Sequence, residues 1–171
     1  MNAVLLLHDL KIVKELVYEK CGLVLTSLKL NAESTEYAAC SFKLNELNIE
    51  YRVSKITPTK VGQFVAIWKR NADGITEPFD ISDNIDFIAI TAKNGENMGQ
   101  FIFPKRVLAE KGIMTQNGKI GKRGIRVYPI WDIVTNKQAE KTKSWQIKYF
   151  LEIKKGVSSD QDRARHMFNQ I

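Results

Sequence analysis

The groups in this sequence that could do chemistry are mostly groups that bind anions, and residues 50–70 hold the first cluster of them. Two runs rich in β-branched and aromatic residues, 50–56 and 61–70, flank the connector 57–60. Pro58 fixes φ and has no N–H, so we predict two strands joined by a tight loop. Cationic and hydroxyl groups at such a loop can hold a phosphate, although a solvated hairpin end has the same composition. The candidate phosphate ligands here are Lys55, Thr57, Thr59, Lys60, Lys69 and Arg70.

A second cluster of cations follows in residues 104–148. This segment has 11 Lys and Arg against 3 Asp and Glu, whereas residues 1–103 have 11 against 13. The net charges of residues 1–103, 104–148 and 149–171 are −2, +8 and +1. A local excess of this kind attracts polyanions, with nucleic acid ahead of acidic protein or anionic lipid. The candidate ligands here are Lys105, Lys119, Lys122, Arg123 and Arg126.

Glycines in the second cluster raise the question of a nucleotide-binding loop. Gly118, Gly121 and Gly124 would let the backbone approach a ligand closely, and cations lie between them. A Walker A motif needs Ser or Thr directly after its Lys, and neither Lys119 nor Lys122 is followed by one. Nucleotide hydrolysis by that route is therefore unsupported.

An acidic stretch contrasts with both clusters. Residues 73–86 contain five acids and no base. Asp80, Asp83 and Asp86 offer the carboxylate oxygens that Mg²⁺ and Ca²⁺ prefer, but the glycine spacing of an EF-hand is missing. We expect a solvated loop or helix cap here, with metal binding as the alternative.

The positions of apolar residues predict an α+β protein. Helices are expected over 2–20, 105–111 and 136–153, with a short last helix that Ser158 to Asp160 would cap and that ends at Phe168. Trp145 is expected in the core. Strands are expected over 36–44, 49–56, 61–69, 86–92 and 98–103, the first three as a meander. We expect one domain over 1–171, with an N-terminal helix 2–20, a core 33–153 and a C-terminal helical tail 157–171.

The lengths of the apolar segments and the spacing of the cysteines indicate the cellular environment of the chain. His8 and Asp9 interrupt the apolar run 3–7, and no apolar segment approaches the roughly 20 residues that cross a bilayer. We therefore expect a cytoplasmic protein without a membrane partner. Cys21 and Cys40 lie among apolar residues without a CxxC spacing, which indicates buried thiols rather than a disulfide or a zinc site.

The sequence combines the segments Glu36-Tyr37, Arg52, 55–60, 62–65, 68–70, 78–80, 99–105, 126–129, Trp131 and Trp145-Gln146. Together these segments resemble the MepB family of small bacterial proteins over roughly residues 33–153. This resemblance implies a fold similar to the restriction-endonuclease core, a mixed, mostly antiparallel central sheet flanked by helices, and nucleic-acid binding without an established reaction. It also implies a gene setting beside a multidrug efflux pump of the MATE type and its repressor.

A nuclease of the restriction-endonuclease class needs an acid on one strand and an acid-x-Lys triplet on the next, because two carboxylates hold Mg²⁺ against the scissile phosphate. Asp83 and Asp86 supply acids, but the following strand ends in Phe103-Pro104-Lys105, which lacks the second acid. Glu50 followed by Ile67-Trp68-Lys69 lacks it as well. We therefore expect no intact nuclease site and no cofactor. Mg²⁺ would be needed only if Asp83, Asp86 and Lys105 were catalytic.

The sequence thus predicts a non-catalytic nucleic-acid-binding protein that contacts the phosphates of double-stranded DNA. The first cluster would lie on one side of a groove and the second on the other. About six neutralised phosphates would give a slope of log affinity against log salt near −5. The alternatives are a Mg²⁺-dependent nuclease and a regulatory module that binds a protein partner, whose identity the sequence does not indicate.

Overall fold

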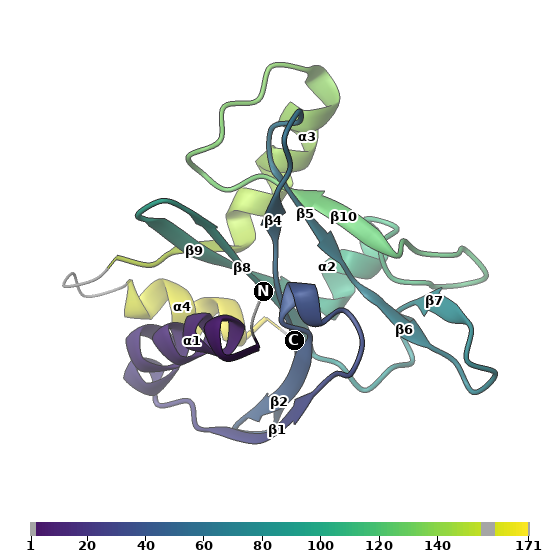
Figure 1. Ribbon diagram of the computed structural model, residues 1–171, viewed down its shortest axis with the longest axis horizontal. Helices are drawn as coiled ribbons and strands as arrows, with labels where there is room; N and C mark the ends of the chain where they lie inside the picture. Colours follow the sequence, from purple (N-terminus) through teal and green to yellow (C-terminus); the bar gives the residue numbers. More distant parts are fainter. Residues whose placement is uncertain (1–2, 155–159, 171) are drawn as a thin grey trace.

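A six-stranded sheet forms the centre of the computed structural model, which describes residues 3–154 and 160–170, with side chains from residue 7 onward (Figure 1). Its strand order is β1-β2-β3-β8-β9-β11, and only the pair β3 and β8 is parallel. The prediction of a mixed, mostly antiparallel central sheet is therefore confirmed. The strands are β1 (Leu25–Leu30), β2 (Cys40–Leu44), β3 (Leu47–Val53), β8 (Phe87–Asn94), β9 (Asn97–Pro104) and β11 (Phe150–Glu152).

Two helical segments cover one face of this sheet. The first is α1 (Ala3–Val13), which continues through a π-helical turn (Lys14–Tyr18) and a 3-10 turn (Glu19–Cys21), and the second is α4 (Gln161–Phe168). Alternate residues of β3, Ile49, Tyr51 and Val53, are buried beneath them. The predicted N-terminal and last helices are confirmed, although residue 2 and Ser158-Ser159 lie outside the described residues. Within the described part, Asp160 caps α4 by accepting from the Arg163 N–H at 3.0 Å.

A second layer covers the other face of the sheet and builds the candidate site. Ile88 and Ile90 of β8 and Phe101 and Phe103 of β9 are buried on this side. The layer contains two helices, α2 (Lys105–Glu110) and α3 (Lys137–Gln146). It also contains two small sheets, one of β4 (Lys55–Ile56), β5 (Gln63–Ala66) and β10 (Gly124–Val127), the other of β6 (Trp68–Arg70) and β7 (Thr76–Pro78).

One prediction about these elements was wrong, and another is confirmed only in part. The expected helix 136–153 ends at Gln146 and, after a 3-10 turn, becomes strand β11, because Phe150 pairs with Phe101 and its ring lies over Gly99. The expected meander of 36–44, 49–56 and 61–69 forms only in part: β2 pairs with β3 and β4 pairs with β5, both antiparallel, but the expected strand 49–56 is divided between β3 and β4, which lie in different sheets. β3 pairs in parallel with β8, whose residues 87–92 are buried on both faces, so β5 is left to join a separate sheet.

The structure has no disulfide between the two cysteines, both of which lie in its described residues. Both cysteines are free thiols; Cys40 is buried, and Cys21 is half-buried. Burial raises the pKa of Cys40 to about 12. Across residues 3–154 and 160–170, no helix has the length and apolar character needed to cross a membrane.

Candidate nucleic-acid interface

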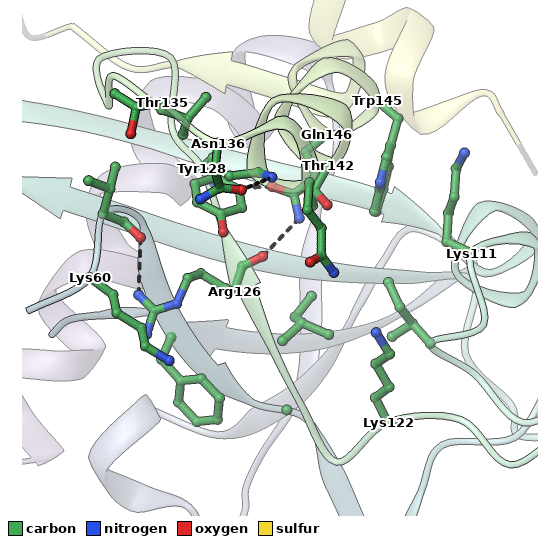
Figure 2. Close-up of a pocket in the computed structure, with 18 of the residues that line it drawn as sticks. Lys60, Lys111, Lys122, Arg126, Tyr128, Thr135, Asn136, Thr142, Trp145 and Gln146 are labelled. Carbon is green, nitrogen blue, oxygen red and sulfur yellow. Dashed lines mark hydrogen bonds between the residues drawn. The ribbon is translucent and has the colours of Figure 1, made fainter.

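A pocket of about 760 Å³ lies between the small sheet β4-β5-β10 and helix α3 (Figure 2). Four of its lining residues are cations, and none of the described lining residues is an Asp or Glu. The remaining lining residues are apolar or neutral polar. The cations are Lys60, Lys111, Lys122 and Arg126, and the neutral polar side chains are Thr59, Tyr128, Thr135, Asn136, Gln138, Thr142 and Gln146.

Gln146 joins the two walls of the pocket. Its side-chain oxygen accepts from the Tyr128 N–H at 2.8 Å, and its amide nitrogen donates to the Arg126 carbonyl at 3.0 Å. Gln146 is 1% exposed, so both bonds are shielded from water. At the other end of α3, Asn136 caps the helix by accepting from the Ala139 N–H at 2.8 Å. The helix wall is therefore fixed at both ends.

Two glycines make room for the aromatic rings of the pocket. Gly62 has φ +84°, and a Cβ there would lie 2.7 Å from Cε1 of Tyr128. A Cβ on Gly124 would lie 2.5 Å from Cζ of Phe64. Because both distances are far below van der Waals contact, only glycine allows Tyr128 and Phe64 to take these positions.

Arg126 brings the two predicted clusters together. Its Nη1 donates to Oγ1 of Thr57 at 3.0 Å and to the carbonyl of Val61 at 3.3 Å, so a cation of the second cluster holds the connector of the first. Within the described part of the chain, Lys60 and Lys122 have neither an ion pair nor a side-chain hydrogen bond. Lys111 lies with Nζ 5.5 Å from the centre of the Trp145 ring. The pocket therefore concentrates positive charge that no described carboxylate neutralises.

The first cluster does not gather at this pocket as a whole. Lys55 pairs with Glu36 at 2.9 Å, Lys69 with Asp83 at 2.6 Å, and Arg70 with Glu33. Lys69 also lies 3.5 Å from Glu77. Thr57 is occupied by Arg126 and by a long hydrogen bond to the Lys60 carbonyl, whereas Thr59 lines the pocket.

The second cluster is divided in the same way. Nζ of Lys105 donates to the carbonyls of Ile81 and Asp83, both at 2.9 Å, and Arg123 binds the carbonyl and hydroxyl of Thr76. Lys119 lies in a turn with Gln116 and does not line the pocket. Of the predicted cations, the structure therefore brings together Lys60, Lys122 and Arg126.

Sequence reasoning missed Lys111 and the face of α3 that lines the pocket. Trp145 contacts Phe103 in the core, as predicted, with ring centres 5.3 Å apart, yet it also lines the pocket. The signal was Thr142, a polar residue within the apolar face of the predicted helix. A polar residue at such a position indicates that the face meets something other than the core.

The family of the chain follows from comparison with known proteins. The model of the MepB-like family matches residues 31–152. The chain belongs to the MepB-like family. The crystal structure of MepB has 36% sequence identity, covers 75% of this chain and 86% of that one, and superposes with a TM-score of 0.73. A bacterial homing endonuclease with 13% identity covers 76% of this chain and 81% of its own, at a TM-score of 0.44. Among curated proteins, none matches this chain.

The MepB-like region contains the whole pocket. Its lining runs from Thr59 to Gln146, inside the matched residues 31–152, whereas α1 and α4 lie outside them. The family thus shares the part of the chain that builds the second layer and most of the central sheet.

The acidic candidates of this MepB-like chain make structural contacts. The carboxylate of Asp83 pairs with Lys69 and also accepts from the Asp80 N–H at 2.8 Å. The carboxylate of Asp86 accepts from the Asn48 N–H at 2.7 Å, which ties it to the start of β3. Backbone and side-chain hydrogen bonds from Ser82 lower the pKa of Asp80. Among the described residues, no three His, Cys, Asp or Glu side chains are grouped to hold a metal ion.

Asp86 and Lys105 do share a smaller pocket of about 320 Å³, which also contains Glu110 and Arg106. Asp83 does not line it. Asp83, Asp86 and Lys105 therefore lie near one another beside the start of β8 and the end of β9. The carboxylates of Asp83 and Asp86, however, do not line one common pocket.

Proposed function

We propose that this protein binds nucleic acid by its phosphates at the pocket between α3 and the β4-β5-β10 sheet, with duplex DNA as the form expected from the sequence. The observation that carries the proposal is the pocket lining, in which four cations are accompanied by no described carboxylate. Side chains of the same sign gathered in a hollow raise the local potential and attract anions.

The availability of these cations supports a phosphate ligand. A phosphate that binds an ion-paired Lys must first displace a carboxylate, whereas Lys60 and Lys122 are exposed and have no such partner in the described chain. Arg126 is held by two neutral oxygens, so its orientation is fixed while its charge stays uncompensated. A guanidinium held in this way can form the fork geometry that phosphate oxygens accept.

The size of the pocket favours a ligand larger than an inorganic anion, and the charge around it favours a polyanion. A volume of about 760 Å³ is much more than one phosphate occupies, and the four cations lie at two opposite ends of the pocket (Figure 2). The surrounding segment 104–148 carries a net charge of +8, which extends the positive field beyond the pocket. A polyanion gains from all of this field, because each neutralised phosphate releases counterions.

Fluorescence anisotropy of a labelled 20-base-pair duplex, titrated with protein at several salt concentrations, tests this proposal. With three to four phosphate contacts, the slope of log affinity against log salt should be roughly −3 to −4. This value is smaller than the sequence alone predicts, because ion pairs occupy several of the cations counted there. No binding at low salt, or an affinity that does not change with salt, would contradict the proposal. The same titration with Mg²⁺, followed by a denaturing gel, shows whether the DNA stays intact.

A further inference from the structure

The cations of the pocket form two pairs at its opposite ends. Arg126 donates to the carbonyl of Val61 and therefore lies beside Lys60. The N–H of Lys122 donates to the carbonyl of Ile113 at 2.8 Å, close to Lys111 in the chain. Figure 2 shows Lys60 and Arg126 on the left of the pocket and Lys111 and Lys122 on the right. A single phosphate would not use both pairs.

Apolar side chains also line the pocket, and we call the following four its apolar floor. Phe64, Ile113, Ile125 and Trp145 all line the pocket. Ile113 and Ile125 are buried in the core, whereas Phe64 and Trp145 are half-buried. Their exposed ring surface is not needed for phosphate contacts, and apolar surface that faces water lowers stability by about 25 cal/mol per Å² relative to a covered surface. A nucleic-acid base has a flat apolar face that such a surface stacks against, whatever the base. The lining thus combines cations for phosphates with a surface for a base.

The polar side chains of α3 complete this arrangement. Gln138 and Thr142 line the pocket, and neither makes a side-chain hydrogen bond within residues 3–154 and 160–170. Their amide and hydroxyl groups can both donate and accept. They can therefore pair with the edge of a base that lies over the apolar floor.

The volume limits which form of nucleic acid can enter. About 760 Å³ lies within the range of small-molecule pockets, roughly 300–1,000 Å³. The major groove of a duplex alone is about 12 Å wide, so a base-paired helix can touch the rim but cannot occupy the interior. A nucleotide that is not base-paired can enter with its two flanking phosphates.

We propose that the pocket receives one unpaired nucleotide, with its base on the apolar floor and its flanking phosphates on the two cation pairs. This inference rests on the proposed binding of nucleic acid and specifies the form of the strand. DNA and RNA share this chemistry. The site would therefore select strand ends, gaps or single-stranded segments over flush duplex.

Four labelled ligands test the proposal: a flush 20-base-pair duplex, and the same duplex with a five-residue overhang of thymidines, of uridines, or of abasic spacers. We expect a thymidine or uridine overhang to bind about tenfold more tightly than the flush duplex, and the abasic overhang to lose most of that gain. Equal affinity for flush and overhang duplexes, or for abasic and thymidine overhangs, would overturn the proposal. If none of the ligands binds in a salt-dependent way, the proposed function fails as well.

A matched pair of variants locates the effect. Thr142→Trp fills the pocket from α3, whereas Ser144→Trp places the same side chain at an exposed position of that helix outside the pocket. Thr142→Trp should abolish the tenfold preference for the overhang over the flush duplex, while Ser144→Trp should keep the preference. Circular dichroism confirms folding of both variants. A preference that survives Thr142→Trp would place the unpaired nucleotide elsewhere.

Discussion

Two regions of this protein contain cations whose surroundings differ. Beside the β6-β7 hairpin, Lys69 contacts Asp83 and Glu77, and Arg70 contacts Glu33. Along the pocket, the cations have no carboxylate neighbour among the described residues. Whether a Lys or Arg can hold a ligand therefore depends on the carboxylates that the fold places beside it.

The hairpin cations and the pocket cations should contribute differently to stability and to binding. An exposed ion pair typically contributes about 0–1 kcal/mol, so the hairpin cations add modestly to the fold. The pocket cations repel one another in the free protein, and this repulsion is relieved when a phosphate binds. Substitutions of the hairpin cations should therefore change stability more than binding, and substitutions of the pocket cations should change binding more than stability.

The largest effect is expected from reversing two pocket charges. Lys60→Glu combined with Lys122→Glu should lower nucleic-acid affinity by about 100-fold at low salt, because two phosphate contacts become repulsive. The control is Lys55→Glu with Arg70→Glu, which changes the net charge by the same amount at ion-paired positions. Anisotropy titrations compare the two proteins. A loss of equal size in the control would show that net charge alone governs binding.

A smaller loss of binding is expected from Gly62→Ala. The new Cβ would meet the Tyr128 ring and displace the pocket wall, so affinity should fall by about tenfold. Gly74→Ala is the control, since Gly74 also has positive φ, at +76°, but no described atom lies within 4 Å of the added Cβ. Both variants should lose about 1 kcal/mol of unfolding free energy from backbone strain. Equal binding by the two variants would contradict the role of the Gly62 contact.

Lys69→Gln should change stability and leave binding unaltered. Burial by itself lowers the pKa of Lys69, but the hydrogen bond and charge of Asp83, followed by Glu77, raise it overall. Removing this cation should reduce the unfolding free energy by about 0.5–1 kcal/mol, measured by urea denaturation at pH 7. Lys122→Gln should do the reverse, with weaker binding and unchanged stability. Weaker nucleic-acid binding by Lys69→Gln would contradict the difference between the ion-paired hairpin cations and the pocket cations.

The smallest effect is expected from the titration of Glu50 in β3, whose carboxylate lies 3.2 Å from Nη1 of the buried Arg52. Burial raises the pKa of Glu50 above its ordinary value of 4.5, although Arg52 opposes the shift. The folded state therefore holds the proton more tightly than the unfolded chain. Stability contributed by Glu50 should fall as pH rises from 4.5 through the raised pKa.

This pH dependence can be measured by comparing the wild type with Glu50→Gln. The difference in unfolding free energy, wild type minus variant, should decrease as pH rises above 4.5, because only the wild type carries the titrating carboxyl group. Urea denaturation at half-unit pH steps gives this difference. A difference that grows with pH would mean that Arg52 outweighs burial at this position.

Much of the fold could be predicted from local pattern. The pair β8 and β9 could be predicted, because the turn-forming residues 93–97 separate the two apolar runs expected as strands 86–92 and 98–103. The end of α3 was not, since Phe150 continues the helical period and only its pairing with Phe101 makes it a strand. Tertiary contacts there override local preference.

The site was less predictable than the fold. Thr57 and Arg126 are 69 positions apart, and their hydrogen bond joins two clusters that no local signal connects. Lys60 and Lys69 lie in one short stretch with the same side chain, but only Lys69 meets carboxylates after folding. Composition could name the candidate cations, whereas the choice among them required the positions of distant Asp and Glu residues.

If the unpaired pocket cations hold phosphates, the salt dependence of binding should differ among three proteins. These are the wild type, Lys60→Gln with Lys122→Gln, and Lys55→Gln with Arg70→Gln. The slope of log affinity against log salt should become shallower by about 2 in the pocket variant, at roughly 0.9 per lost contact, and stay unchanged in the other. Equal slopes in the wild type and the pocket variant would contradict the claim.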